Sequence, residues 1–221
     1  MKKYSIIVAG GKGTRMQSST PKQFLIVNGL PILMHTINKF FNAESDNHII
    51  LALPKDQIGT WKALIKEYNF STPHQVITGG DTRFQSVDNA IQYIPNQECL
   101  IAIHDGVRPL VATSVIQRSF KEALEHGSAI PTVAVKESIR EVTPMGNKAM
   151  NRDEFVLVQT PQTFRSDVLF PAFENAYNSS FTDDASVAEF AGFKMHLFEG
   201  NNENIKITTP EDLKIGATLL A

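Results

Sequence analysis

The sequence predicts an α/β protein built on one doubly wound, mostly parallel sheet. Continuous apolar runs of strand length, such as residues 48–53 and 99–104, alternate with amphipathic stretches of helical period. Apolar runs that do not alternate with polar residues are typical of strands covered by helices on both faces. The chain has 221 residues, of which 42% are hydrophobic, and this is enough for one domain with a substantial core.

Each element follows from such a pattern. We expect strands at 5–9, 48–53, 75–78, 99–104, 128–135, 155–159, 193–199 and 204–208. We expect helices at 31–43, 56–68, 84–94, 113–126, 166–177, 183–191 and from 209 onward. Pro31 and Pro210 suit first helical turns, Thr209 suits an N-cap, and Gly127 suits a helix end.

Residues 136–152 interrupt the alternation and contain few apolar side chains. Pro144 and Gly146 occupy positions favoured in a tight turn that starts at Thr143. We expect a β-hairpin arm that projects from a single domain spanning residues 1–221. Because an isolated hairpin is marginally stable in water, we expect it to pack on a second copy of the chain; a solvated loop is the alternative.

Charge and composition exclude several classes of protein. Basic residues number 21 and acidic residues 23, so a formal net charge of −2 argues against binding to nucleic acid or anionic membrane. The single cysteine, Cys99, excludes an intrachain disulfide and a zinc site with paired cysteines. The N-terminal apolar run is too short for a signal sequence, and we expect a cytoplasmic protein.

A glycine-rich loop follows the first predicted strand, at Ala9–Met16. Gly10, Gly11 and Gly13 allow the backbone to approach an anion closely. Lys12 and Arg15 lie in the loop and Lys22 follows it, a set of cations that suits a triphosphate. The alternative is a tight turn with solvated cations.

A second group of polar residues, His104–Pro109, follows the strand at 99–104. Ligands of open parallel sheets bind at the carboxyl ends of the strands, where the glycine loop also lies. A single carboxylate, Asp105, suits Mg²⁺, which completes its shell with phosphate oxygens and water. The alternative is that Asp105 caps a turn and pairs with Arg108. We expect His104 to be a packed strand-end residue rather than a base.

Further polar patches lie at 79–83 with Ser86, at 159–162, preceded by Arg152, and at 182–186. Ser186 suits a helix N-cap. Lys206 lies in the predicted strand 204–208, on the face opposite the isoleucines, where it is either solvated or directed at a phosphate.

Together these residues resemble the cytidylyltransferases that activate 2-C-methyl-D-erythritol 4-phosphate in non-mevalonate isoprenoid synthesis. The resemblance spans essentially the whole chain, with seven motifs in the family's order. They are Ala9–Met16, Pro21–Phe24, Gly79–Asp81, His104–Pro109, Gln159–Gln162, Thr182–Ser186 and Asn204–Thr208. The resemblance implies a Rossmann-like nucleotidyltransferase fold and transfer of CMP from CTP to the polyol phosphate.

The resemblance also implies roles for individual residues. Arg15 and Lys22 would stabilise the transition state, Lys206 would hold the reacting phosphates, and Asp105 would hold Mg²⁺. The nucleotide would bind to Ala9, Gly10, Gly11, Gly13, Gly80, Asp81, Ser86, Asp105, Gly106 and Arg108. The acceptor would bind to Arg152, Thr160, Thr182 and Asp183. In this family the hairpin crosses to the partner of a homodimer, so Arg152 and Ser138 would complete the neighbouring site.

The sequence departs from the family's pattern at three positions, because members commonly have alanine at Gly106, threonine at Ser138 and glutamate at Asp184. The related ribitol 5-phosphate cytidylyltransferases share the nucleotide motifs and are an alternative. A non-catalytic nucleotide-binding module is another, although the cations it would lose are retained here. A dehydrogenase is disfavoured, because the loop is not GxGxxG with an acidic residue about 20 positions later.

Overall fold

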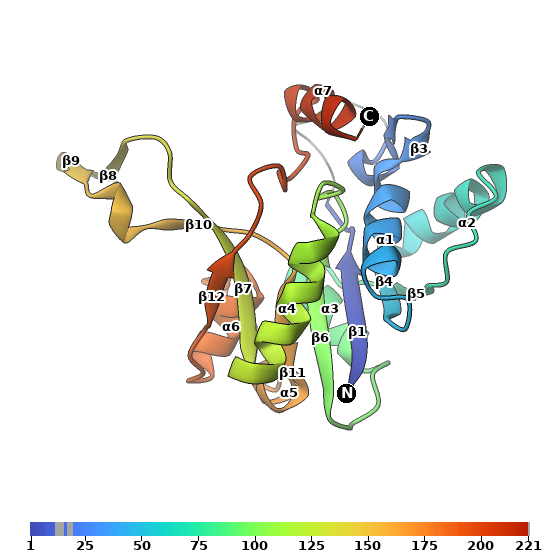
Figure 1. Ribbon diagram of the computed structural model, residues 1–221, viewed down its shortest axis with the longest axis horizontal. Helices are drawn as coiled ribbons and strands as arrows, with labels where there is room; N and C mark the ends of the chain where they lie inside the picture. Colours follow the sequence, from blue (N-terminus) through green and yellow to red (C-terminus); the bar gives the residue numbers. More distant parts are fainter. Residues whose placement is uncertain (12–15, 17–19, 221) are drawn as a thin grey trace.

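A mostly parallel sheet organises the molecule (Figure 1). The computed structural model describes residues 1–11, 16 and 20–220, and eight strands of this part join in the order β10-β7-β11-β6-β1-β4-β5, with β12 beside β7. The strands are β1 (Lys2–Val8), β4 (His48–Leu53), β5 (Gln75–Thr78), β6 (Cys99–Asp105), β7 (Ser128–Ala134), β10 (Val156–Val158), β11 (Gln162–Arg165) and β12 (Leu197–Glu199). β1 lies between β4 and β6 and is parallel to both, whereas β10 and β11 run antiparallel to their neighbours. The predicted fold class is confirmed.

Helices cover both faces of the sheet, as continuous apolar strands require. On one face lie α1 (Ile32–Ala43), α2 (Ile58–Glu67) and α4 (Thr113–His126), around a core that contains Phe40, Trp61 and Phe120. On the other lie α3 (Arg83–Ile91), α5 (Ser166–Phe173) and α6 (Asp184–Phe190), around Phe164. The last helix, α7 (Pro210–Leu219), starts at the predicted Thr209 cap and covers a smaller cluster around Ile207.

The structure lacks one expected strand and contains one that was not expected, while the strand expected at 193–199 is limited to 197–199 and the helix expected at 166–177 ends at 173. Residues 204–208 are not a strand; one backbone bond, from Ile207 N to Val107 O (2.9 Å), fastens them over the end of the sheet. β11 was not predicted, because its four residues Gln162–Arg165 include one large apolar side chain, Phe164. It is inserted antiparallel between β6 and β7, where pairing with Ile103 and Ala102 buries it.

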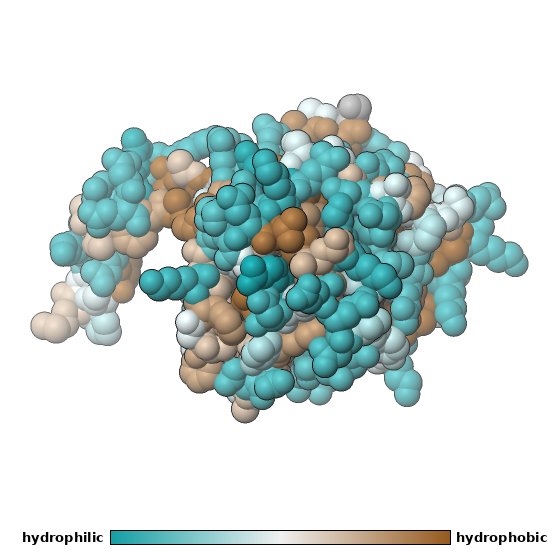
Figure 2. Space-filling view, turned by 60° about the horizontal axis from the view of Figure 1, so that its bottom comes forward, coloured by the Kyte–Doolittle hydropathy of each residue, from teal (hydrophilic) through white to brown (hydrophobic). Residues whose placement is uncertain are grey.

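The expected hairpin arm is present. β8 (Ile139–Thr143) and β9 (Gly146–Met150) pair antiparallel, and the arm stands away from the body of the molecule (Figures 1 and 2). Among the described residues, no helix has the length and apolar content that a membrane span needs.

Candidate active site

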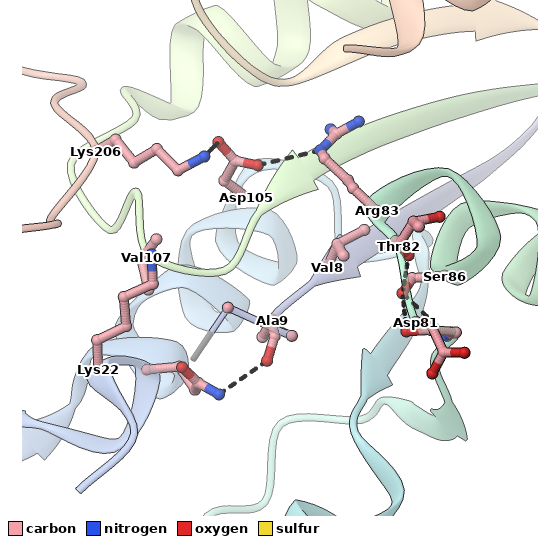
Figure 3. A pocket seen from close by; sticks show the side chains of 14 residues that line it. Val8, Ala9, Lys22, Asp81, Thr82, Arg83, Ser86, Asp105, Val107 and Lys206 are labelled. Atoms are coloured by element: carbon pink, nitrogen blue, oxygen red, sulfur yellow. Dashed lines mark hydrogen bonds and ion pairs between the residues drawn. The ribbon is translucent and has the colours of Figure 1, made fainter. Parts of the chain in front are cut away.

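The two predicted binding loops meet at the point where the sheet reverses its strand order. β1 pairs with β4 on one side and with β6 on the other, and the residues that follow β1 and β6 leave the sheet at the same edge. In open parallel sheets this switch point is where ligands bind. A cavity of about 320 Å³ lies here, between the glycine loop, the start of α3, Asp105 and Lys206 (Figure 3).

The start of the glycine loop forms one wall of this first cavity. Ala9, Gly10 and Gly11 line it, and Gln23 donates a hydrogen bond from Nε2 to Ala9 O (2.9 Å), which holds the loop against η2 (Lys22–Phe24). A Cβ at Gly11 would lie 3.3 Å from Lys22 Nζ, so the lysine passes directly over the glycine. Lys12, Gly13 and Arg15 of the predicted site lie outside the described residues.

The loop before α3 forms the opposite wall. Gly80, Asp81 and Ser86 line the cavity as predicted, and Gly80 N donates to Ser86 Oγ (3.1 Å). A Cβ at Gly80 would overlap the Cβ of Gln85, so only glycine fits there. Thr82 caps α3 in a capping box with Gln85. This loop therefore brings the backbone of Gly80 and the side chains of Asp81, Thr82 and Ser86 to the cavity.

Asp105 lies at the centre of the site and is surrounded by cations. Its carboxylate is 3.0 Å from Lys206 Nζ, 3.2 Å from Arg108 Nε and 3.5 Å from Arg83 Nε. Burial alone would raise the pKa of Asp105, but Arg83, Lys206 and Arg108 together outweigh it and hold that pKa far below its usual range. The local pair of Asp105 with Arg108 is therefore present, and Asp105 also lines the cavity.

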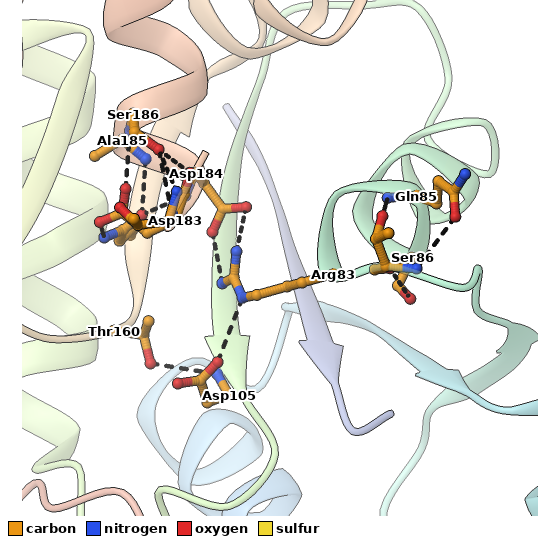
Figure 4. A network of polar contacts seen from close by, with 12 residues as sticks. Arg83, Gln85, Ser86, Asp105, Thr160, Asp183, Asp184, Ala185 and Ser186 are labelled. Atoms are coloured by element: carbon orange, nitrogen blue, oxygen red, sulfur yellow. Dashed lines mark hydrogen bonds and ion pairs between the residues drawn. The ribbon is translucent and has the colours of Figure 1, made fainter. Parts of the chain in front are cut away.

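Arg83 belongs to the predicted polar patch 79–83 but, like Asp184, had no predicted role. Arg83 donates from Nη1 and Nη2 to the two carboxylate oxygens of Asp184, both at 2.7 Å, and its Nε faces Asp105 (Figure 4). Burial would lower the pKa of Arg83, but the carboxylates of Asp184 and Asp105 raise it above its usual value. The available signal was a cation two residues after the motif Gly79–Asp81.

A second cavity, of about 220 Å³, lies on the far side of Asp105. Arg83, Asp105 and Lys206 line both cavities and form the wall between them. Thr160, Thr182 and Asp183, which the resemblance assigns to the acceptor, line the second cavity with Arg108.

Hydrogen bonds to one glutamine fix this wall of the second cavity. Gln162 Nε2 donates to Asp183 Oδ2 (2.7 Å), and Gln162 Oε1 accepts from the backbone N–H of Asp184 (3.0 Å). Asp183 caps α6, with its carboxylate accepting from Ser186 N (2.9 Å). The expectation that Ser186 caps this helix is therefore wrong: Asp183 is the N-cap, and Ser186 takes the third position of the capping box.

His104 supports the site from behind and remains neutral. It is fully buried, and burial lowers its pKa to about 3. Its Nε2 donates to Arg108 O (3.1 Å), so Nδ1 accepts from Thr160 Oγ1 (3.0 Å), and that oxygen accepts from Asp105 N (3.2 Å). His104 thus positions Thr160 and Asp105, in agreement with the expectation that it is not a base.

Three predicted residues do not line either cavity. Gly106 lies behind the first wall, where a Cβ would be 2.8 Å from the Cβ of Ala9. Ser138 is exposed at the base of the arm, and Arg152 donates to Lys136 O (2.7 Å) and is exposed. Arg152 and Ser138 can therefore reach such a cavity only in another copy of the chain or after a movement of the arm.

Asp105 is the side chain that suits a hard divalent cation. Its carboxylate is held ionised, lines both cavities and offers the oxygen ligands that Mg²⁺ prefers. Three cationic side chains already contact these oxygens and would repel Mg²⁺. Binding of the ion at Asp105 therefore requires the added negative charge of a polyphosphate beside it.

Comparisons with known proteins agree with this geometry. Residues 4–221 match the sequence profile of the 2-C-methyl-D-erythritol 4-phosphate cytidylyltransferase family. A protein of Bacteroides thetaiotaomicron with that name is 50% identical over 220 residues, covering 100% of both chains. One of Azobacteroides pseudotrichonymphae is 47% identical, covering 99% of this chain and 98% of its own. The crystal structure of the Francisella tularensis protein of that name is 31% identical, with a TM-score of 0.82 over 99% of this chain and 100% of that chain.

The pKa of His104 generates a prediction about stability. In the unfolded chain the histidine takes up a proton below about pH 6.5, whereas the folded protein does not protonate it until about pH 3. The free energy of unfolding should therefore fall as the pH is lowered from 6.5 to 5, by up to about 1.4 kcal/mol per pH unit from this group. Urea unfolding across this range should show a shallower slope for His104→Gln. Equal slopes for both proteins would contradict the prediction.

Proposed function

The chain belongs to the 2-C-methyl-D-erythritol 4-phosphate cytidylyltransferase family, and we propose that its two cavities bring CTP and 2-C-methyl-D-erythritol 4-phosphate together for transfer of CMP. The product is 4-diphosphocytidyl-2-C-methyl-D-erythritol, made in the cytoplasm for non-mevalonate isoprenoid biosynthesis. A phosphate oxygen of the acceptor forms a bond to the α-phosphorus of CTP, the bond to the β-phosphate breaks, and pyrophosphate leaves.

One observation carries this proposal: a single charged wall of Arg83, Asp105 and Lys206 separates two cavities that open on either side of it. The transfer joins two anionic substrates at one phosphorus atom, so both must approach the same cations. The attacking oxygen is already an anion, and no base is needed, which agrees with the neutral His104. Catalysis then depends on alignment and on neutralising charge at the α-phosphate.

In this proposal the first cavity holds CTP. Gly10, Gly11 and Gly13 cradle the triphosphate, and Lys22, extended over Gly11, neutralises it together with Arg15. Gly80, Asp81 and Ser86 read the cytosine with backbone and small side-chain groups. The close packing of Gly80 on Gln85 leaves this wall no freedom to retreat for a purine.

Lys206 and Asp105 are proposed to exchange partners when the nucleotide binds. The ammonium of Lys206 now lies 3.0 Å from Asp105 and is partly exposed toward both cavities. A triphosphate offers Lys206 a stronger partner, which leaves an Asp105 oxygen for Mg²⁺. When bound there, Mg²⁺ would neutralise and orient the triphosphate oxygens.

The second cavity is proposed to hold the acceptor. Thr160, Thr182 and Asp183 offer a hydroxyl, a second hydroxyl and a carboxylate, which suit the hydroxyl groups of a polyol. Arg152 supplies a cation for the acceptor phosphate, and Ser138 lies near it on the arm.

We propose that Arg152 and Ser138 act in the site of a partner within a homodimer. The arm and the strand after it expose apolar side chains, with Met145 99%, Val142 79% and Leu157 54% exposed. Arg152 is fastened to the base of the arm through Lys136 O. An arm that packs on a second copy would bury these apolar side chains and carry Arg152 with it.

A substrate panel tests the function. Pyrophosphate release should occur with Mg²⁺, CTP and 2-C-methyl-D-erythritol 4-phosphate, and UTP, ATP and GTP should be poor replacements for CTP. Turnover of ribitol 5-phosphate without turnover of methylerythritol phosphate would overturn the acceptor and leave the nucleotidyl transfer intact. No turnover with either acceptor would instead favour a non-catalytic nucleotide-binding module.

Lys22→Ala should lower kcat about 100- to 1,000-fold with a smaller change in KM, because this cation acts mainly on charge that develops in the transition state. Lys62→Ala, at an exposed position of α2, is the matched control and should leave both constants unchanged. A rise in KM with kcat retained would show that Lys22 binds the ground state instead.

Mixed dimers test the origin of Arg152. Each of Arg152→Ala and Lys22→Ala alone should be strongly impaired. Co-expression of the two should form heterodimers in which one site combines an intact body with an intact arm. The mixture should then recover roughly a quarter of the wild-type sites. Activity equal to the mean of the two parent variants would contradict an arm that acts across the dimer.

A further inference from the structure

We infer a transition-metal site, separate from the Asp105 centre, formed by Glu122, His126 and His196. The ligand atoms of these three residues all lie within 4.8 Å of one another. Two imidazoles and one carboxylate form a set that takes Zn²⁺ or a similar borderline ion, whereas Mg²⁺ prefers oxygen ligands.

The distances match such an ion. His196 Nε2 lies 3.1 Å and His126 Nε2 lies 3.5 Å from the same oxygen, Glu122 Oε2. In a tetrahedral zinc site with bonds of ~2.0–2.1 Å, ligand atoms lie about 3.3 Å apart. The Nε2 atoms of both imidazoles therefore lie close to the distance from Glu122 Oε2 that a shared ion would set.

The backbone holds the three residues in place. Glu122 and His126 are one turn apart on α4, and Gly127 ends that helix with a φ of 86°. His196 N donates to Ser128 Oγ (3.0 Å), and His196 O accepts from Ile130 N (2.8 Å). The helix end and the segment before β12 are thus both tied to β7, so binding requires little reordering.

The packing of the two rings brings both Nε2 atoms to one carboxylate. The rings are stacked, with centroids 3.8 Å apart and planes 20° apart, and both Nε2 atoms face the same Glu122 oxygen. A metal-free cluster in which the rings donate N–H groups to that oxygen accounts for the same contacts, so metal binding itself decides between the two. Glu125 also faces His126, at 4.0 Å, as a further oxygen.

The Glu122, His126 and His196 cluster lies far from the Asp105 centre. α4 ends and β7 begins at the amino ends of the strands, whereas Asp105 lies at the carboxyl end of β6, at the opposite edge of the sheet (Figure 1). An ion here would join α4 to the segment before β12 and stabilise the fold. The inference does not depend on the proposed function.

Calorimetric titration of the chelator-treated protein with Zn²⁺ tests the site. The wild-type protein should bind one ion that His196→Ala and Glu122→Gln each weaken at least about 10-fold, whereas His48→Gln should bind as the wild type does. Zn²⁺ should raise Tm in the wild type and not in His196→Ala, and Co²⁺ should give the visible absorption of a low-coordinate site. Turnover in Mg²⁺ should be the same for His196→Ala and the wild type. No binding, or equal binding by the wild type and His196→Ala, would overturn the inference.

Discussion

A half-buried guanidinium held between two carboxylates is the contact on which the site depends. Arg83 begins α3, Asp105 ends β6 and Asp184 begins α6. The three charges therefore join two helices of one face to the end of a central strand. Asp184 is 1% exposed, and a buried charge persists only when it is paired and hydrogen-bonded. Removing one partner of such a pair leaves an uncompensated charge and typically destabilises a protein by about 3–5 kcal/mol. The position of α3 is therefore coupled to the position of α6.

The same contact sets the distance between the two loops that are proposed to bind the substrates. The loop Gly80–Thr82 directly precedes Arg83, and Thr182–Asp183 directly precedes Asp184. A bidentate pair has a defined geometry. The pair of Arg83 with Asp184 therefore fixes the proposed nucleotide loop and the proposed acceptor loop relative to each other. This gives Asp184 a role: its carboxylate is the anchor of Arg83. The shorter acid, where related proteins commonly have glutamate, still reaches Arg83 at 2.7 Å.

Most of the fold could be predicted from the sequence, because buried parallel strands and amphipathic helices leave strong periodic signals. Residues 48–53 and 113–126 have the predicted bounds for that reason. β11 has no such signal, since its burial comes from the neighbours β6 and β7 rather than from its own four residues. Residues 204–208 have a strand pattern but only one backbone bond to the sheet end, because no strand partner remains there. The loops of the candidate site could be predicted, because their glycines and charged residues follow predicted strands. The pair of Arg83 with Asp184 could not, because the two residues are 101 positions apart and meet only through the packing of the fold.

The site is built to manage charge rather than to move protons. Burial keeps His104 neutral, while its neighbours keep Asp105 ionised and Arg83 charged, so these three groups keep their protonation state throughout the neutral range. A phosphate monoester that attacks phosphorus supplies its own negative charge, and its second ionisation falls near pH 6. The reaction then needs fixed positive charge at a defined position more than it needs a base. Arg83, held on both carboxylate oxygens of Asp184, provides such fixed charge, and His104, which does not titrate in this range, supports the wall from behind.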